Sequence, residues 1–493
     1  MRTWSAKLLD FPLWAWLAIF ALLQIFFSLF TYSMSLSFDE SIWYYIGRNW
    51  FRHGLVPYTG GVDNKSPLIF AIFGFSDFLF GVNEWFPRII GTAGQTIGLY
   101  FIYELAKILA NTRAALLALT IYGLSLLWPA TGGKYVSYTE TYSVAAVIAA
   151  YYFYYKNAGT KKSILSGFLG GLAIGFRISA FMAVLGLLVS VIVYRPKSFL
   201  AVTGGMLICL IMLLSAAWLS KINIGEYFAY GLKDNFATGS PTDHAWLWKL
   251  RNFSDHFIFS SLIIFLPAII GWFFLPVKND PIFIWFCTSF IGIHLIGIYS
   301  TQHFKELLPA MALITAMVID YSTRQWHITP GIILILIWIV FFPKTREPFV
   351  SLRNSLTRKP ADQDSYCANR EIIPDEAAKK RLGLWIKSTT KPGTQVLIAG
   401  FGAEIQAYAE RISPSIYFNT TETAMAIRQL KRDLTYARPS LVLIPAYHEY
   451  EHQVIPELRS AVDDFVRYDY ALDSCIFGYY IYRTKRSLTA EHE

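Results

Sequence analysis

Charged residues are scarce in this sequence. Only 16% of its 493 residues are Asp, Glu, Lys or Arg, whereas 54% are hydrophobic and 17% are aromatic. The hydrophobic residues form many separate runs of about 20 residues, the length that a helix needs to cross the hydrocarbon of a bilayer. This composition excludes a soluble globular protein and predicts a polytopic α-helical membrane protein.

Cysteine is also rare. The four cysteines, Cys209, Cys287, Cys367 and Cys475, have no metal-binding spacing. The first two lie in hydrophobic runs, where a buried thiol is the ordinary case. Cys367 and Cys475 could form a disulfide if the C-terminal region is extracytoplasmic. Internal repeats and low-complexity tracts are absent as well.

The net charge of +9 does not indicate nucleic-acid binding. The basic residues are spread over short loops between apolar runs, which is the pattern of positive-inside topology. The first run, Phe11–Thr31, is too long for the core of a signal peptide and lacks a small-x-small cleavage pattern. We therefore expect an uncleaved membrane anchor.

Eleven runs are predicted to span the membrane. They are Phe11–Thr31, Arg88–Ala106, Ala114–Thr131, Thr141–Tyr155, Ser163–Phe176, Ile178–Tyr194, Phe199–Ser220, Phe257–Leu275, Pro281–Tyr299, Leu307–Tyr321 and Ile328–Phe342. A further run, Pro67–Val82, is short and has Asp77 near its middle. If it spanned, the positive-inside bias of all later loops would reverse. We therefore predict a juxtamembrane or re-entrant helix there, a cytoplasmic N-terminus and an extracytoplasmic C-terminus.

After Phe342 the sequence becomes polar and contains several prolines. We predict a membrane-embedded catalytic module over 1–342, a linker over 343–374 and an extracytoplasmic α/β domain over 375–493. Helices are expected at Asp375–Thr389, Ala403–Arg411, Thr423–Ala437 and Glu451–Phe465, and strands at Gln395–Ala399, Ser415–Phe418, Leu441–Ile444, Tyr468–Leu472 and Ile476–Arg483. Gly400-Phe401-Gly402 lacks the third glycine of a dinucleotide site.

Two adjacent carboxylates, Asp39 and Glu40, follow the first span on the predicted external face. They could simply cap the helix predicted at Ile42–His53, because Asp is a good capping residue. They could also carry out chemistry at the membrane surface. The two interpretations are compatible, because a cap position holds a carboxylate rigidly.

Several further charged residues are candidates. Arg177 interrupts the uncharged stretch 165–193, where a cation needs a partner, a cavity or a helix end from which to snorkel. A lipid phosphate would match its guanidinium. Lys65 precedes Pro67, which is well placed to begin a helix. Glu140 and Lys134 could be solvated loop charges, and a single histidine such as His303 is more often structural than a ligand.

Five segments, in this order, resemble the GT-C superfamily of polyprenyl-phosphate-dependent glycosyltransferases. They are Asp39-Glu40, Asn64-Lys65-Ser66-Pro67-Leu68, Tyr138-Thr139-Glu140, Gly170–Ala180 and His303–Pro309. The closest group comprises the protein O-mannosyltransferases and the bacterial lipid A aminoarabinose transferases. Its Lys-Pro-Pro-Leu string has Ser66 in place of the first proline, and Phe304 replaces a tyrosine. The Trp-Trp-Asp string of oligosaccharyltransferases is absent.

The resemblance implies a membrane glycosyltransferase that transfers one sugar, with inversion, from a polyprenyl-phosphate donor to a lipid, glycan or protein acceptor on the extracytoplasmic face. Asp39 is the candidate base, with Glu40 and Glu140 as further catalytic candidates. Lys65 and Arg177 would bind the donor phosphate. Lys134 and His303 are candidate substrate contacts.

Cofactor use and two other functions remain open. A divalent cation, if one is used, would be held by Asp39 and Glu140. The alternative function is a lipid or sugar transporter or flippase. Transporters, however, commonly contain inverted repeats, and this sequence has no internal repeat. A sensor with an external ligand-binding domain would leave Asp39-Glu40 and Lys65 without a purpose.

Overall fold

A computed structural model describes residues 11–31, 35–128, 131–132, 134–156, 159–233, 245–258, 261, 266, 269–273, 280–296, 299–327, 330–357, 363–419, 424–447 and 456–485. The chain forms two compact units. The helical unit comprises Met1–Ser33, Trp85–Ala216 and Pro241–Leu356. The mixed unit comprises Met34–Glu84, Ala217–Ser240 and Thr357–Glu493.

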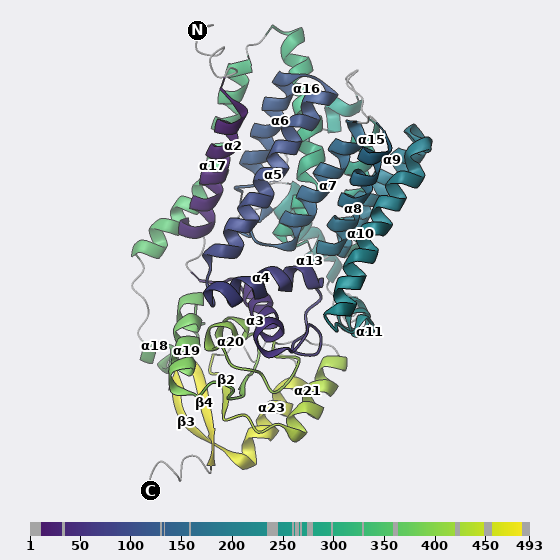
Figure 1. Ribbon diagram of the computed structural model, residues 1–493. Helices are drawn as coiled ribbons and strands as arrows, with labels where there is room; N and C mark the ends of the chain where they lie inside the picture. The colour runs from purple at the N-terminus through teal and green to yellow at the C-terminus, as the bar shows by residue number, and fades with distance from the viewer. Residues whose placement is uncertain are drawn as a thin grey trace. The chain divides into compact units, whose positions relative to one another are not determined.

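The helical unit is built from long helices that pack side by side (Figure 1). Its principal helices are α2 (Leu13–Ile25, continued by a π-helix to Thr31), α5 (Trp85–Leu109), α6 (Thr112–Ser125), α7 (Thr139–Tyr155), α8 (Thr160–Phe176), α9 (Phe181–Tyr194), α10 (Phe199–Leu219), α13 (Ala245–Phe253), α15 (Asp280–Ile296), α16 (Leu308–Gln325) and α17 (Pro330–Thr357). Its core contains fully buried aromatic residues, among them Tyr151 and Trp285, whose rings stack with centroids 4.2 Å apart.

The predicted spans coincide with these helices, except that Phe257–Leu275 lies largely outside the described residues. Two described helices, Leu13–Thr31 and Pro196–Leu219, are long and apolar enough by themselves to cross a membrane. The total of eleven spans and the direction in which the chain crosses stay predictions.

Glycine allows close helix packing within the helical unit. A Cβ atom at Gly205 of α10 would lie 2.0 Å from the carbonyl oxygen of Ile164 of α8, and one at Gly167 would lie 1.8 Å from that of Val202. No other residue could occupy these positions without moving the backbone. Small residues therefore set the approach of α8 to α10, as they do at many membrane helix interfaces.

The mixed unit contains a four-stranded sheet in the order β1-β2-β4-β3. Its strands are β1 (Val396–Ile398), β2 (Leu441–Pro445), β3 (Tyr470–Ile476) and β4 (Tyr479–Thr484), and its helices are α3 (Phe38–His53), α4 (Pro67–Phe80), α11 (Ile224–Glu226), α18 (Gln363–Ala368), α19 (Glu376–Thr389), α20 (Ala403–Ala409), α21 (Ala424–Tyr436) and α23 (Pro456–Asp469). β1 pairs parallel with β2, and β4 pairs antiparallel with both β2 and β3. All five residues of β2 are buried.

Most of the elements predicted after residue 375 are present, but the strand predicted at Ser415–Phe418 is wrong. That segment is irregular, and its Ile416 carbonyl accepts a hydrogen bond of 3.0 Å from Val62 N–H. The first residues of the helix predicted at Glu451–Phe465 lie outside the described part of the chain, and α23 accounts for the rest. The segment predicted as a linker is partly helical, because α17 continues to Thr357 and α18 follows.

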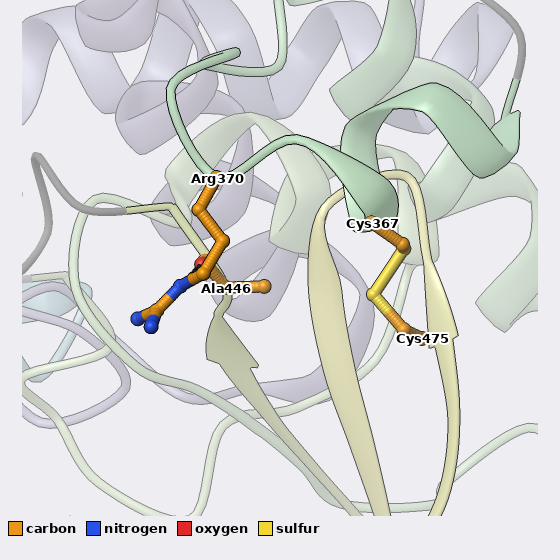
Figure 2. Close-up of a disulfide and its surroundings, with 4 residues drawn as sticks. All are labelled: Cys367, Arg370, Ala446 and Cys475. Carbon is orange, nitrogen blue, oxygen red and sulfur yellow. Dashed lines mark hydrogen bonds between the residues drawn. A yellow bond between two sulfur atoms is a disulfide. The ribbon is translucent and has the colours of Figure 1, made fainter.

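A disulfide joins Cys367 in α18 to Cys475 in β3, as the sequence allowed (Figure 2). Close by, Arg370 Nε donates a 2.8 Å hydrogen bond to the carbonyl oxygen of Ala446, just after β2. The segment that enters the α/β part of the mixed unit is thus attached to the sheet by one covalent bond and one hydrogen bond.

Candidate active site

The first candidate residues lie at the start of α3, where the cap differs from the prediction. Ser37, and not Asp39, is the N-cap residue. The Ser37 side chain accepts from Glu40 N–H, and Glu40 Oε2 accepts a 2.9 Å hydrogen bond from Ser37 N–H, which completes a capping box. Glu40 is buried, whereas Asp39 in the same turn is only partly buried. The adjacent carboxylates therefore have different surroundings.

The face of α3 that carries Asp39 also contacts the loop before α4. Trp43 lies one helical turn after Asp39, and side chains four residues apart share a face. Trp43 Nε1 donates a 2.9 Å hydrogen bond to Asp63 Oδ2. Lys65 follows in this loop and contacts the side-chain oxygen of Asn64. Asp39 and Lys65 thus lie on a helix and a loop that are joined by the hydrogen bond between Trp43 and Asp63.

Lys65 is partly buried, and its backbone carbonyl accepts a 2.7 Å hydrogen bond from Tyr58 Oη. Among the described residues, no carboxylate forms an ion pair with its ammonium group. Asp77, the acidic residue noted within Pro67–Val82, pairs instead with Arg52 at 2.5 Å. The cation before α4 is therefore available to an anionic ligand.

A second group of candidates gathers in the helical unit around Arg177, which follows the last residue of α8. Arg177 Nη1 lies 2.7 Å from Glu140 Oε1 in the first turn of α7, and Arg177 Nε lies 2.7 Å from Glu306 Oε1. Ser179 Oγ accepts from Arg177 Nε and donates to Glu306 Oε1. All three charged side chains are buried, so the cation in the apolar stretch has two carboxylate partners.

The short 3₁₀ helix Thr301–Glu306 supplies three residues to this cluster. His303 Nε2 lies 3.8 Å from Glu140 Oε1. Lys305 Nζ donates a 2.7 Å hydrogen bond to the carbonyl oxygen of Tyr135. Burial lowers the pKa of Lys305 to about 8, although nearby Glu140 acts to raise it. Burial also raises the pKa of Glu306, against the opposing effect of Arg177.

His303 was predicted from the sequence as a site candidate, whereas Lys305 and Glu306 were not. Both residues could have been identified from the sequence, because the charged string His303–Glu306 directly precedes an apolar helix. Lys134, in contrast, is exposed, and its ammonium group lies 4.9 Å from the centre of the Tyr135 ring. Within the described ranges, no three His, Cys, Asp or Glu side chains are grouped so that they could hold a metal ion.

Several solved structures share the fold of this chain. ArnT from Cupriavidus metallidurans, in a crystal structure with bound undecaprenyl phosphate, has a TM-score of 0.64 and 12% identity, over 95% of this chain and 97% of ArnT. AglB, an archaeal oligosaccharyltransferase from Archaeoglobus fulgidus in complex with an inhibitory peptide and a dolichol-phosphate, has a TM-score of 0.54 and 12% identity, over 96% of this chain and 74% of AglB. The chain has the fold of the GT-C membrane glycosyltransferases.

The family comparison agrees with this class. Residues 64–218 match the family model described as dolichyl-phosphate-mannose-protein mannosyltransferase. No curated protein matches the chain significantly in sequence. The resemblance to GT-C enzymes that the motifs predicted is confirmed by the fold of the chain and by the family match of residues 64–218.

Proposed function

We propose that the chain transfers one sugar from a polyprenyl-phosphate donor to an acceptor hydroxyl on the extracytoplasmic face, with inversion at the anomeric carbon and with Asp39 as general base. The observation that carries this proposal is that the two adjacent carboxylates have different surroundings. Glu40 is engaged in the capping box, and Asp39 lies partly exposed on the face of α3 that contacts the Asp63–Lys65 loop.

The chemistry requires a base and a cation. The acceptor oxygen attacks the anomeric carbon as the bond to the phosphate oxygen breaks, and the acceptor proton passes to Asp39. The departing polyprenyl phosphate gains negative charge in the transition state. A cation that is already in place stabilises that charge without reorganising. Lys65, which has no carboxylate partner among the described residues, is our first candidate for this role.

Arg177 is the second candidate for binding the donor phosphate. Its guanidinium is held by Glu140 and Glu306, which fix its position but also neutralise part of its charge. Glu140 would then act through Arg177, by orienting it. His303, at 3.8 Å from Glu140, belongs to the same network.

The nature of the donor follows by analogy with proteins of the same fold. ArnT was solved with undecaprenyl phosphate and AglB with a dolichol-phosphate. A donor carried on a polyprenyl phosphate fits the family match of residues 64–218, which also favours an enzyme over the transporter or flippase considered above. The disulfide Cys367–Cys475 supports an extracytoplasmic location for the mixed unit, because disulfides persist mainly in oxidising compartments.

The test is an Asp39→Asn substitution in the purified enzyme, assayed with lipid-linked sugar donors extracted from the native membrane. The amide keeps the shape of the side chain but removes its basicity, so we expect turnover to fall by about 10²–10⁴-fold. Thermal stability should be unchanged, because Ser37 and Glu40 form the cap.

The matched control is Asp375→Asn. Asp375 is also located at a helix start in the mixed unit, as the N-cap of α19, and asparagine caps equally well. This variant should turn over like the parent. Near-normal turnover of Asp39→Asn would exclude Asp39 as the base.

A further inference from the structure

One buried hydroxyl in the C-terminal part of the mixed unit binds both ends of the helix pair α3–α4. Leu36 N–H donates a 2.8 Å hydrogen bond to Tyr408 Oη of α20, and Leu36 directly precedes Ser37, the N-cap of α3. Tyr408 Oη in turn donates to Glu84 Oε1 at 2.6 Å, four residues beyond the end of α4. Tyr408 is 3% exposed, and its bond to Leu36 N–H is fully buried.

The direction of these hydrogen bonds is fixed by chemistry. A backbone N–H can only donate, so the Tyr408 oxygen accepts from Leu36 and its own proton is directed to Glu84. Lys380 Nζ also contacts Glu84 Oε1 at 2.6 Å and lies 5.0 Å from the centre of the Tyr408 ring. The ammonium group of Lys380 therefore helps to hold the Glu84 carboxylate in place as the acceptor.

The same helix, α20, binds α3 further along its length. The guanidinium of buried Arg48 donates to the carbonyl oxygens of Ala407 at 2.7 Å and Gln406 at 3.3 Å, in the last turn of α20. A cation at this end of a helix satisfies carbonyls that have no partner within the helix.

The chain that follows α20 adds two more contacts to α3. Tyr45 Oη accepts a 2.9 Å hydrogen bond from Ser413 N–H, and the rings of Tyr45 and Phe418 lie with centroids 4.0 Å apart. Together with Leu36 and Arg48, these contacts attach α3 to the C-terminal chain over three helical turns.

We propose that α20 and the chain after it form a rigid support for α3, and that Tyr408 is the positioning residue for Asp39. The inference rests on the proposed function only for its catalytic consequence. Asp39 lies three residues after Leu36, in the first turn, where helices open most readily. Loss of the Leu36–Tyr408 bond releases the chain just before the cap and lets Asp39 shift, and shifts of about 1 Å can cost about 10²-fold in rate.

The experiment compares Tyr408→Phe with Tyr470→Phe in the full-length enzyme. Both substitutions remove one buried hydroxyl and keep the ring. Tyr470 Oη donates a 2.7 Å hydrogen bond to the carbonyl oxygen of Pro439, in the same unit, and Tyr470 is likewise buried. Hydrogen–deuterium exchange is measured on peptides covering Leu36–Ser41, and kcat and the donor KM are measured separately.

We expect Tyr408→Phe to exchange faster over Leu36–Ser41, with kcat lowered about 10-fold or more and the donor KM within about twofold. Tyr470→Phe should match the parent in exchange and in both kinetic constants. Unchanged exchange in Tyr408→Phe, or unchanged kcat, would overturn the proposal.

Failure of the base assignment is distinguishable from failure of this inference. If Asp39→Asn were active, Asp39 would not be the base. The exchange measurement would still decide whether Tyr408 supports the start of α3.

Discussion

At the scale of single residues, the environment of Arg177 could be predicted only in part from the sequence. The cost of a cation in an apolar stretch predicted that it must have a partner, and we suggested a lipid phosphate. The structure shows two protein carboxylates, Glu140 and Glu306, each 2.7 Å from the guanidinium. The need for a partner was predictable from the sequence. The identity of the partners was not, because Glu140 and Glu306 are 37 and 129 residues away from Arg177, and no local sequence pattern indicates contacts at such separations.

This ion cluster leads to a stability prediction. Arg177→Met leaves two buried carboxylates without their cation, which should destabilise the enzyme by about 3–5 kcal/mol. Adding Glu140→Gln and Glu306→Gln to the same variant removes the unpaired charges and should restore most of that loss. Denaturant unfolding of the detergent-solubilised protein measures both effects.

Turnover of the triple variant distinguishes a structural role of Arg177 from a role in binding the donor. If Arg177 binds the donor phosphate, the triple variant stays slow although it is stable. The control is Lys197→Met, which removes an exposed cation from the loop before α10 and should change neither property. A triple variant with parental turnover would remove Arg177 from the donor site.

The first residue of α3 and its cap residue were predicted incorrectly. The sequence pattern predicted a helix from Ile42, with Asp39 as a candidate cap residue. The pattern Ser37-x-x-Glu40 is itself a capping-box signature, so the true start was readable from the sequence. The aromatic residue between the two, Phe38, is a helix residue rather than part of the preceding loop.

At the scale of elements, periodicity predicted most helices and strands within a few residues. The strands β1 and β2 were evident because they are continuous apolar runs flanked by glycine, proline or serine. Ser415–Phe418 has a similar composition, but its backbone hydrogen bonds go to Val62 in the loop before α4 and to the side chains of Ser413 and Ser415. Burial against other parts of the chain, and not strand pairing, explains its apolar residues.

Helix packing gives a prediction that compares two adjacent glycines. A Cβ atom at Gly205 would lie 2.0 Å from Ile164 O, whereas one at Gly204 meets nothing within 4 Å. Gly205→Ala should therefore destabilise the α8–α10 contact by about 1–3 kcal/mol. Gly204→Ala should be neutral or stabilising by up to about 1 kcal/mol, because alanine favours the helix.

Unfolding of the two glycine variants under the same conditions measures the contrast. Each substitution adds one methyl group to the same helix, so general effects of detergent or composition cancel. Equal stabilities for the two variants would contradict the close packing of α8 against α10.

At the scale of the whole molecule, the sequence predicted the GT-C fold but not how the chain divides. The predicted domains follow the order of the sequence, whereas residues 34–84 form one compact unit with the chain after 357. Contacts such as Leu36 to Tyr408 join residues 372 positions apart, and hydrophobic periodicity contains no information about them. The number of spans and their direction stay predictions from loop charge.

The most direct test of the central claim is mass spectrometry of extracytoplasmic lipids, glycans and proteins in a strain that lacks this enzyme. The account predicts that one product loses the mass of a single sugar and that a polyprenyl-phosphate sugar accumulates. The parent enzyme should restore the product, and the Asp39→Asn variant should not. An unchanged set of products in the deletion strain, or full restoration by Asp39→Asn, would contradict the account.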